Sequence, residues 1–167
     1  MKKLLLLVIT TTILFSCKPT DLTFNEMVDL SYEEALSIQP LANFYEASAT
    51  KNENGIKSVF QGVKNTTILV AVSSTGAVVS EVVDSPFMDD VVIKLPVKMT
   101  LEEAEQLLLD AGYGTGIEGV ADWSIVVLRR PLGPEVTPAL YIFTTSKGYV
   151  SVNTITKEVG STQALLG

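Results

Sequence analysis

The sequence predicts an α+β protein built as two tandem units, each a helix packed on an antiparallel β-sheet. Three observations lead to this prediction. A complete helix signal occupies residues 100–112, a weaker copy of its opening stands at residues 31–35, and runs rich in β-branched residues follow both. With 167 residues, 47% of them hydrophobic, the chain is long enough for one domain or two small ones with a sizeable core.

The helix at residues 100–112 has a start signal, an apolar stripe and a stop signal. Thr100 and Glu103 have the spacing of a capping box, and Gly112 suits the position after the last turn, where positive φ is favoured. Acidic residues in the first turn complement the helix dipole, which explains them without a catalytic role. The apolar residues recur at helical spacing: Leu101, Ala104, Leu107, Leu108 and Ala111.

The first unit is predicted to span residues 30–86. Ser31 and Glu34 form a second candidate capping box, and Pro40 forbids continuation of that helix. Segments rich in β-branched and aromatic residues, separated by turn residues, then predict strands. These strands are expected at residues 43–50, 56–60, 67–73 and 77–84.

The second unit is predicted to span residues 87–167. An extended segment precedes its helix, and Pro96 marks a strand end or an edge. Its strands are expected at residues 123–130, 139–145 and 149–154.

The two units also resemble each other in their hairpins. Residues 68–76 match residues 140–148 in pattern, at nearly the spacing that separates Ser31 from Thr100. Two elements in the same order at nearly one spacing indicate a repeated unit. Chance similarity is the alternative, because the identity between the halves is low.

The first seventeen residues resemble a lipoprotein signal. Two lysines precede an apolar stretch that is too short to span a bilayer, and the stretch ends in Leu14-Phe15-Ser16-Cys17. Leu14, Ser16 and Cys17 match the lipobox of bacterial lipoproteins. An ordinary secretory signal with an incidental cysteine is the alternative.

The lipobox resemblance implies removal of residues 1–16 and attachment of a diacylglyceryl group to Cys17, often with a further acyl chain such as palmitate on its amine. Two or three acyl chains anchor a protein stably. Residues 17–29 would then be the tether of an exported protein in the cell envelope. Lys18 stands where an Asp would signal inner-membrane retention, which favours the outer membrane.

The composition excludes much chemistry. The chain has no histidine and one cysteine, so a Ser-His-Asp relay, a His-ligated zinc site and an intrachain disulfide are impossible. The net charge of −7 disfavours nucleic acid as a partner. We therefore expect a protein that is not an enzyme and has no cofactor or metal. A hydrolase that uses carboxylates alone is a weak alternative.

Three residues near one predicted strand are candidates for partner binding: Trp123, Arg129 and Arg130. Trp and Arg are enriched at interface hot spots. The alternative is a core tryptophan beside two solvated charges on an edge strand. Residues 114–119 spell G-x-G-x-x-G, but a helix precedes them and a strand follows, the reverse of a dinucleotide-binding motif, so we expect a loop.

The second unit resembles PepSY domains, whose closing strand carries a Tyr-x-Val-x-Val-Asp-x-x-Thr-Gly-x-Val signature. Asn153 replaces the usual Asp, and Lys157 stands where Gly is expected. The two-unit architecture resembles the PepSY-like, beta-lactamase-inhibitor-like lipoproteins of Bacteroidetes-type bacteria. The positions that match the signature are Tyr149, Val150, Val152, Asn153, Thr156 and Val159.

A rival resemblance is to the opening of a PASTA domain, a peptidoglycan-associated module, over residues 95–113.

The PepSY-like resemblance implies a protein that binds or inhibits a protein partner, such as a protease or another envelope enzyme, through its sheet surface. The alternative function is architectural, in contact with peptidoglycan or an outer-membrane complex.

Overall fold

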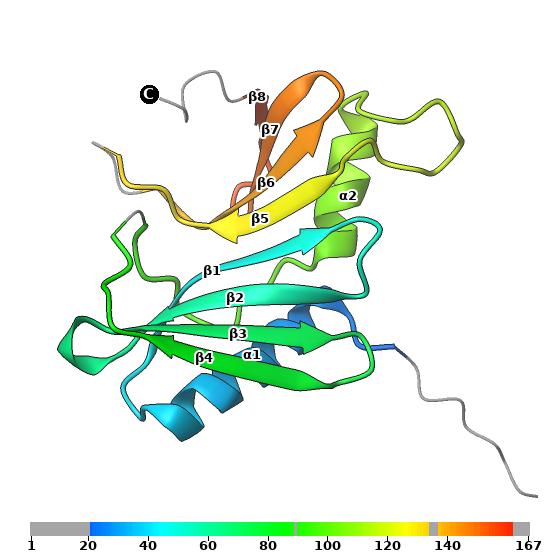
Figure 1. The fold of residues 1–167 in the computed structure, drawn as a ribbon. Helices are drawn as coiled ribbons and strands as arrows, with labels where there is room; N and C mark the ends of the chain where they lie inside the picture. Colours follow the sequence, from blue (N-terminus) through cyan, green and yellow to red (C-terminus); the bar gives the residue numbers. More distant parts are fainter. Residues whose placement is uncertain (1–20, 89, 134–136, 162–167) are drawn as a thin grey trace, which may run out of the picture.

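A computed structural model describes residues 21–88, 90–133 and 137–161. Within these residues the chain forms one antiparallel sheet of eight strands in the order β4-β3-β2-β1-β5-β6-β7-β8. Two helices pack against the sheet, and α1 lies behind β2–β4 in the view of Figure 1. The fold is therefore mixed α and β, as predicted. The predicted signal peptide, residues 1–16, and Cys17 lie outside the described residues.

Helix α1 (Phe24–Ile38) begins earlier than predicted. Its capping box is formed by Thr23 and Glu26, so the predicted box at Ser31 and Glu34 is wrong. The reason is that the apolar stripe extends upstream, with Phe24, Met27 and Val28 buried against the sheet. Residues 24–29, predicted as tether, thus form the first turns of the helix.

Ser31 lies in the middle of α1 and is buried. Its hydroxyl donates to the Val28 carbonyl at 2.7 Å and contacts the Ser58 hydroxyl at 2.9 Å, so it joins the helix to the sheet. A residue that resembled a helix start in the sequence is a satisfied polar residue of the core.

Helix α1 covers the first four strands: β1 (Asn43–Thr50), β2 (Gly55–Gln61), β3 (Thr67–Ser73) and β4 (Val78–Val83). They follow one another as an antiparallel meander, with the short 3-10 turn η1 (Val63–Asn65) before β3. All four strands were predicted from the sequence. Phe44, Phe60 and Ile68 are fully buried beneath the helix.

Residues 84–99 connect β4 to the second helix. Residues 91–97, predicted to be extended, form no strand. Instead, the Val91 amide donates to the Arg130 carbonyl and the Ile93 amide donates to the Phe44 carbonyl, both at 2.9 Å. The segment is thus held between the ends of β1 and β5 by single hydrogen bonds, without the repeated pairing of a strand.

Helix α2 (Leu101–Asp110) has the predicted capping box of Thr100 and Glu103, and Gly112 has the predicted positive φ, 88°. The loop with the G-x-G-x-x-G pattern follows α2 and ends in a bridge from Gly114 to Ala121, as expected for a loop. In the described part of the chain, neither helix is long and apolar enough to cross a bilayer.

The remaining strands are β5 (Ile125–Arg129), β6 (Leu140–Thr145), β7 (Gly148–Asn153) and β8 (Val159–Ser161). They form a second meander, next to which α2 lies. Tyr141 and Phe143 are fully buried here. Strand β8 was not among the predicted strands.

The two meanders share one sheet, so the prediction of a separate sheet for each unit is wrong. Strand β1 pairs with β5 antiparallel, from Glu46 opposite Arg129 to Thr50 opposite Ile125. This pairing satisfies the backbone groups of two strands that would otherwise be exposed edges. The matched hairpins are β3–β4 and β6–β7, which are the third and fourth strands of one meander and the second and third of the other. The spacing used to infer the repeat therefore does not align equivalent strands.

We predict that Thr23→Ala lowers the free energy of unfolding by about 1 kcal/mol, because it removes the N-cap of α1. Urea denaturation followed by circular dichroism measures this change. Ser37→Ala, at an exposed hydroxyl in the last turn of the same helix, is the matched control and should change stability little. Equal effects of the two variants would contradict the observed helix start.

Candidate functional site

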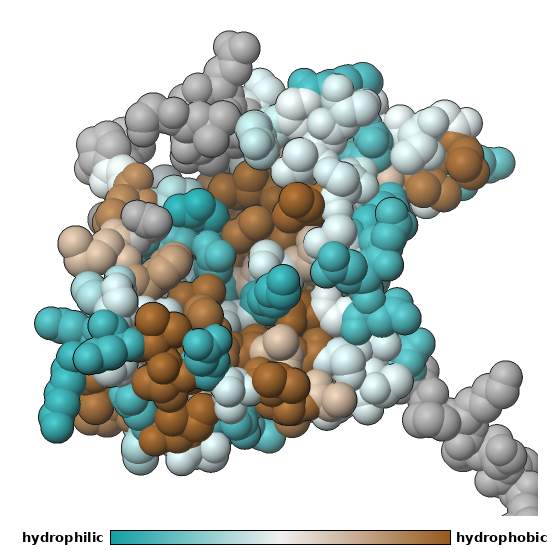
Figure 2. Space-filling model, in the orientation of Figure 1, coloured by the Kyte–Doolittle hydropathy of each residue, from teal (hydrophilic) through white to brown (hydrophobic). Residues whose placement is uncertain are grey.

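One face of the sheet is covered by the helices, and the other is not. Along β3, Ile68, Val70 and Val72 are buried on the covered face, while Leu69 and Ala71 alternate with them and are exposed. No helix or strand of the described residues lies over this second face, which we call the open face. Figure 2 shows it in the orientation of Figure 1, with hydrophobic surface interrupted by hydrophilic residues.

Two rows of directly paired residues run across the strands of the open face. Since paired residues of antiparallel strands lie on the same face, the register defines each row. One row, from β4 to β7, is Glu81, Leu69, Val59, Glu46, Arg129, Leu140 and Asn153. The next row is Val79, Ala71, Lys57, Ser48, Val127, Ile142 and Ser151.

Several large apolar side chains are exposed on this face. Val79 is 71% exposed, Ile125 43% and Leu69 38%. Charged side chains stand next to them, since Lys57 pairs with Ala71 and Glu81 pairs with Leu69. The open face therefore combines apolar contact area with charges of both signs.

A groove of about 470 Å³ lies on the open face, where the ends of β1, β2 and β3 meet the turn before β4. Small residues make it hollow, among them Gly55, Ala71 and Ala77. A side chain at Gly55 would place its Cβ 2.6 Å from the Val72 carbonyl oxygen, so only glycine fits there. Val79 and Ile125 line the groove from its two sides.

Trp123, a predicted partner-binding residue, lies between α2 and the covered face. Its indole Nε1 donates to Glu105 Oε1 at 2.7 Å, and its ring meets Phe143 edge-on at 6.1 Å between centroids. The Lys51 ammonium lies 5.1 Å from the ring centroid. These contacts give Trp123 a packing role, which agrees with the structural alternative; a role in partner binding stays a prediction.

Arg129 is the last residue of β5, Arg130 follows the strand, and the two side chains have different partners. Arg129 belongs to the open face and forms a salt bridge at 2.5 Å with Asp90, whose side chain is fully buried. Arg130 donates from Nε to the Thr137 carbonyl at 2.7 Å and from Nη1 to the Val92 carbonyl at 3.4 Å. The structure therefore does not bring the two arginines together with Trp123 as one site.

Burial shifts the pKa of two groups near α2. It raises the pKa of Tyr141, whose hydroxyl donates to the Met99 carbonyl at 3.0 Å. It also raises the pKa of the half-buried Glu105 carboxyl, which the hydrogen bond from Trp123 only partly offsets. In the described residues, no group of three or more acidic or cysteine side chains is placed to hold a metal ion.

The residues of the open face could not be identified from sequence. Leu69, Ala71 and Val79 read as ordinary strand residues, and the continuous apolar pattern left it undecided whether both faces of these strands are covered. Burial in the structure separates the two faces.

The sequence matches no protein-family model and no curated protein. Among solved structures, the chain is similar to a candidate lipoprotein from Clostridium difficile 630, with a TM-score of 0.59 and 15% identity. The similarity covers 86% of this chain and 93% of that one. At this identity it shows a shared fold. The resemblance to PepSY domains is not confirmed.

We predict that Glu105→Gln stabilises the protein at neutral pH and has a smaller effect near pH 4. The pKa of Glu105 is raised in the folded state, so the protein is more stable below the ordinary pKa, where the carboxyl is protonated. This stability is lost as pH rises through the raised folded-state pKa. Glutamine keeps an oxygen that can accept from Trp123.

Urea unfolding of both proteins between pH 4 and pH 8 measures the difference. Glu102→Gln, at an exposed position of the same helix, is the control. If the stability of Glu105→Gln ran parallel to that of the wild type across this range, the stated role of the carboxyl would be wrong.

Proposed function

We propose that this chain is a non-catalytic, lipid-anchored protein of the bacterial cell envelope that binds a protein partner through the open face. One observation carries the proposal: an eight-stranded sheet is covered by helices on one side only, and its other side exposes Leu69, Val79 and Ile125. Large exposed apolar side chains gathered on one face are typical of interaction surfaces.

The size of the open face suits a protein. Eight strands about 4.8 Å apart extend over about 34 Å, and strands of about six residues are about 20 Å long. The product is about 680 Å² for the whole face, part of which, at the buried Leu140 and beside the buried Asp90, is already covered. The exposed remainder is below the roughly 800 Å² that each partner contributes to a standard interface, so it suits a small protein interface. The groove beside Val79 would receive one protruding side chain of the partner.

The chemistry of the open face also suits a protein partner. Apolar side chains at Leu69, Val79 and Ile125 would form the dry centre of an interface, and Lys57 and Glu81 would supply charged contacts next to it. Strand side chains are already ordered before binding, which reduces the entropy lost on association. An envelope enzyme is the partner class implied by the resemblance to inhibitor-like lipoproteins.

The order of elements supports the proposed tandem origin. Each half consists of a helix followed by a meander of four strands, and the halves meet where β1 pairs with β5. This arrangement is what two copies of one unit would form if they joined through their equivalent first strands. In this arrangement β1 corresponds to β5, whereas the hairpin comparison had aligned β3 with β6.

The lipid anchor is supported by the lipobox at residues 14–17 and by the fold shared with a protein described as a candidate lipoprotein. Because α1 starts at Phe24, residues 17–23 can span at most about 25 Å, even fully extended. The folded part would therefore stay close to the membrane, most favourably the outer membrane, and would act on partners that are located there.

We predict that Cys17→Ser abolishes lipidation, since serine cannot form the thioether bond. Wild-type protein should incorporate labelled palmitate and enter the detergent phase in Triton X-114 partition, and the variant should do neither. If the variant still incorporated the label and entered the detergent phase, the anchor would lie elsewhere.

We predict that a photo-crosslinking amino acid at Leu69 captures a discrete protein in cells, because Leu69 is an exposed apolar residue of the open face, between Glu81 and Val59. The same group at Glu33, exposed on α1, is the matched control and should capture none. Adding Val79→Asp should remove the Leu69 product without lowering the melting temperature, since Val79 is largely exposed.

Equal products from Leu69 and Glu33, or a Leu69 product that survives Val79→Asp, would contradict the proposal. Co-sedimentation with purified peptidoglycan tests the architectural alternative. The wild-type protein should remain in the supernatant if it binds a protein partner, and should pellet if it is a cell-wall protein.

A further inference from the structure

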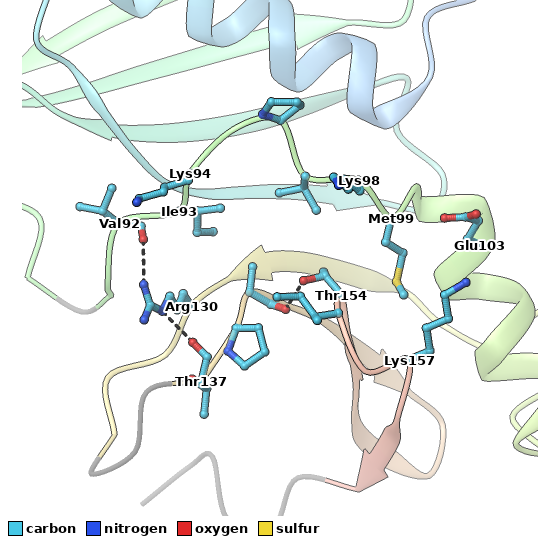
Figure 3. A pocket seen from close by; sticks show the side chains of 15 residues that line it. Val92, Ile93, Lys94, Lys98, Met99, Glu103, Arg130, Thr137, Thr154 and Lys157 are labelled. Carbon is cyan, nitrogen blue, oxygen red and sulfur yellow. Dashed lines mark hydrogen bonds between the residues drawn. The ribbon is translucent and has the colours of Figure 1, made fainter.

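A second and larger concavity lies beside the N-terminal end of α2. Its volume is about 950 Å³, at the upper end of the range of small-molecule sites. Residues 92–99 and the start of α2 form one wall; the end of β5, residues 137–139 and the turn after β7 form the other (Figure 3).

Hydrogen bonds hold the two walls in place. Arg130 joins them, because its guanidinium donates to the carbonyls of Val92 and Thr137. On one side, the Tyr141 hydroxyl donates to the Met99 carbonyl at 3.0 Å. On the other, the Thr154 hydroxyl donates to the Ala139 carbonyl at 2.7 Å. The cavity is thus a formed feature of the fold.

The lining of this cavity is largely apolar. Aliphatic and proline side chains come from both walls, and Met99 contributes its thioether from the segment before α2 (Figure 3). Such a surface favours the aliphatic part of a ligand over water. The apolar lining residues are Val92, Ile93, Pro96, Val97, Met99, Pro138, Ala139 and Ile155.

The charged lining is mostly basic. Lys94, Lys98, Lys157 and Arg130 face one acid, Glu103, so the lining has a formal charge of +3 in a chain of −7. Glu103 is occupied with the cap of α2, where Oε2 accepts from the Thr100 amide at 3.1 Å. Within the described part of the chain, none of the three lysines forms a salt bridge. The unneutralised positive charge attracts an anion.

One polar atom of the lining also lacks a partner. The Thr137 hydroxyl oxygen is buried and forms no hydrogen bond with the described residues. A buried polar atom without a partner is unfavourable. A ligand with hydrogen-bonding oxygens would satisfy it, next to the Arg130 guanidinium.

We propose that this cavity binds a small amphiphilic anion, with a carboxylate or phosphate head held by the basic residues and an aliphatic body along the apolar wall. This site is separate from the groove on the open face, because the two share no lining residue and the cavity lies beside the start of α2, at Met99 and Glu103. It gives the protein a ligand-binding activity in addition to partner binding, and the two can be tested independently.

Three probes with the same chain and different heads test the proposal: dodecanoate, dodecyl phosphate and dodecanol. They are added as monomers to the purified folded protein, and binding is measured by isothermal titration calorimetry. We expect both anions to bind at one site and dodecanol to bind at least tenfold more weakly. Higher salt should weaken the binding of both anions and leave the binding of dodecanol unchanged.

Charge-neutralising variants locate the site. Lys98→Gln with Lys157→Gln should weaken dodecanoate binding at least fivefold, without a change in the melting temperature, because both side chains are exposed. Lys64→Gln with Lys147→Gln removes the same charge at exposed positions outside the cavity and should leave binding unchanged. Equal binding of dodecanol, absence of binding, or equal loss in both double variants would overturn the proposal.

The source of the head group is distinguished by a flotation assay. The site would be assigned to a membrane lipid if unlipidated protein floated with vesicles of anionic phospholipid but not with phosphatidylcholine vesicles. The Lys98 and Lys157 double variant should then lose this co-flotation. Binding of monomeric dodecanoate without co-flotation would assign it to a free amphiphile. Either result supports the shared chemistry.

Discussion

The antiparallel pairing of β1 with β5 is the interaction on which the rest of this structure depends. It joins two meanders into one sheet and places both helices on the same side. At the junction, Ala47 and Ala49 face Leu128 and Val126 on the covered face, so small side chains of one strand leave room for large ones of the other. Without this pairing, each half would expose an unpaired edge, and the open face would be two narrow surfaces.

The same junction also creates the cavity beside α2. Because β1 and β5 separate beyond Glu46 and Arg129, residues 91–93 can enter between their ends and continue along the cavity wall towards α2. Arg129 fixes this segment through Asp90, and Arg130 fixes it through Val92. Two arginines that resemble a binding pair in the sequence thus hold the connection between the halves.

Predictions from the sequence were correct where all the residues that produce a structural feature lie in one segment. The capping box of Thr100 and Glu103 was predicted correctly because the cap, the stripe and Gly112 all lie within one stretch. The start of α1 was missed because Thr23 and Ser31 both have an acid three residues later. Only burial against β2 shows that Ser31 lies inside the helix and Thr23 caps it. Residues 91–97 form no strand, because they bond to the chain beyond the β1–β5 pairing only through the Val91 and Ile93 amides.

By itself, the sequence determined the helix and strand types and the resemblance of residues 14–17 to a lipobox, because each depends on residues close together in the chain. Its composition alone excluded histidine chemistry. Tertiary structure alone decided that the halves share one sheet, that Leu69 and Val79 are exposed, and that Lys94 and Lys157 line one cavity. The physical reason is that burial and strand pairing depend on residues far apart in the sequence, whose distance no local pattern specifies.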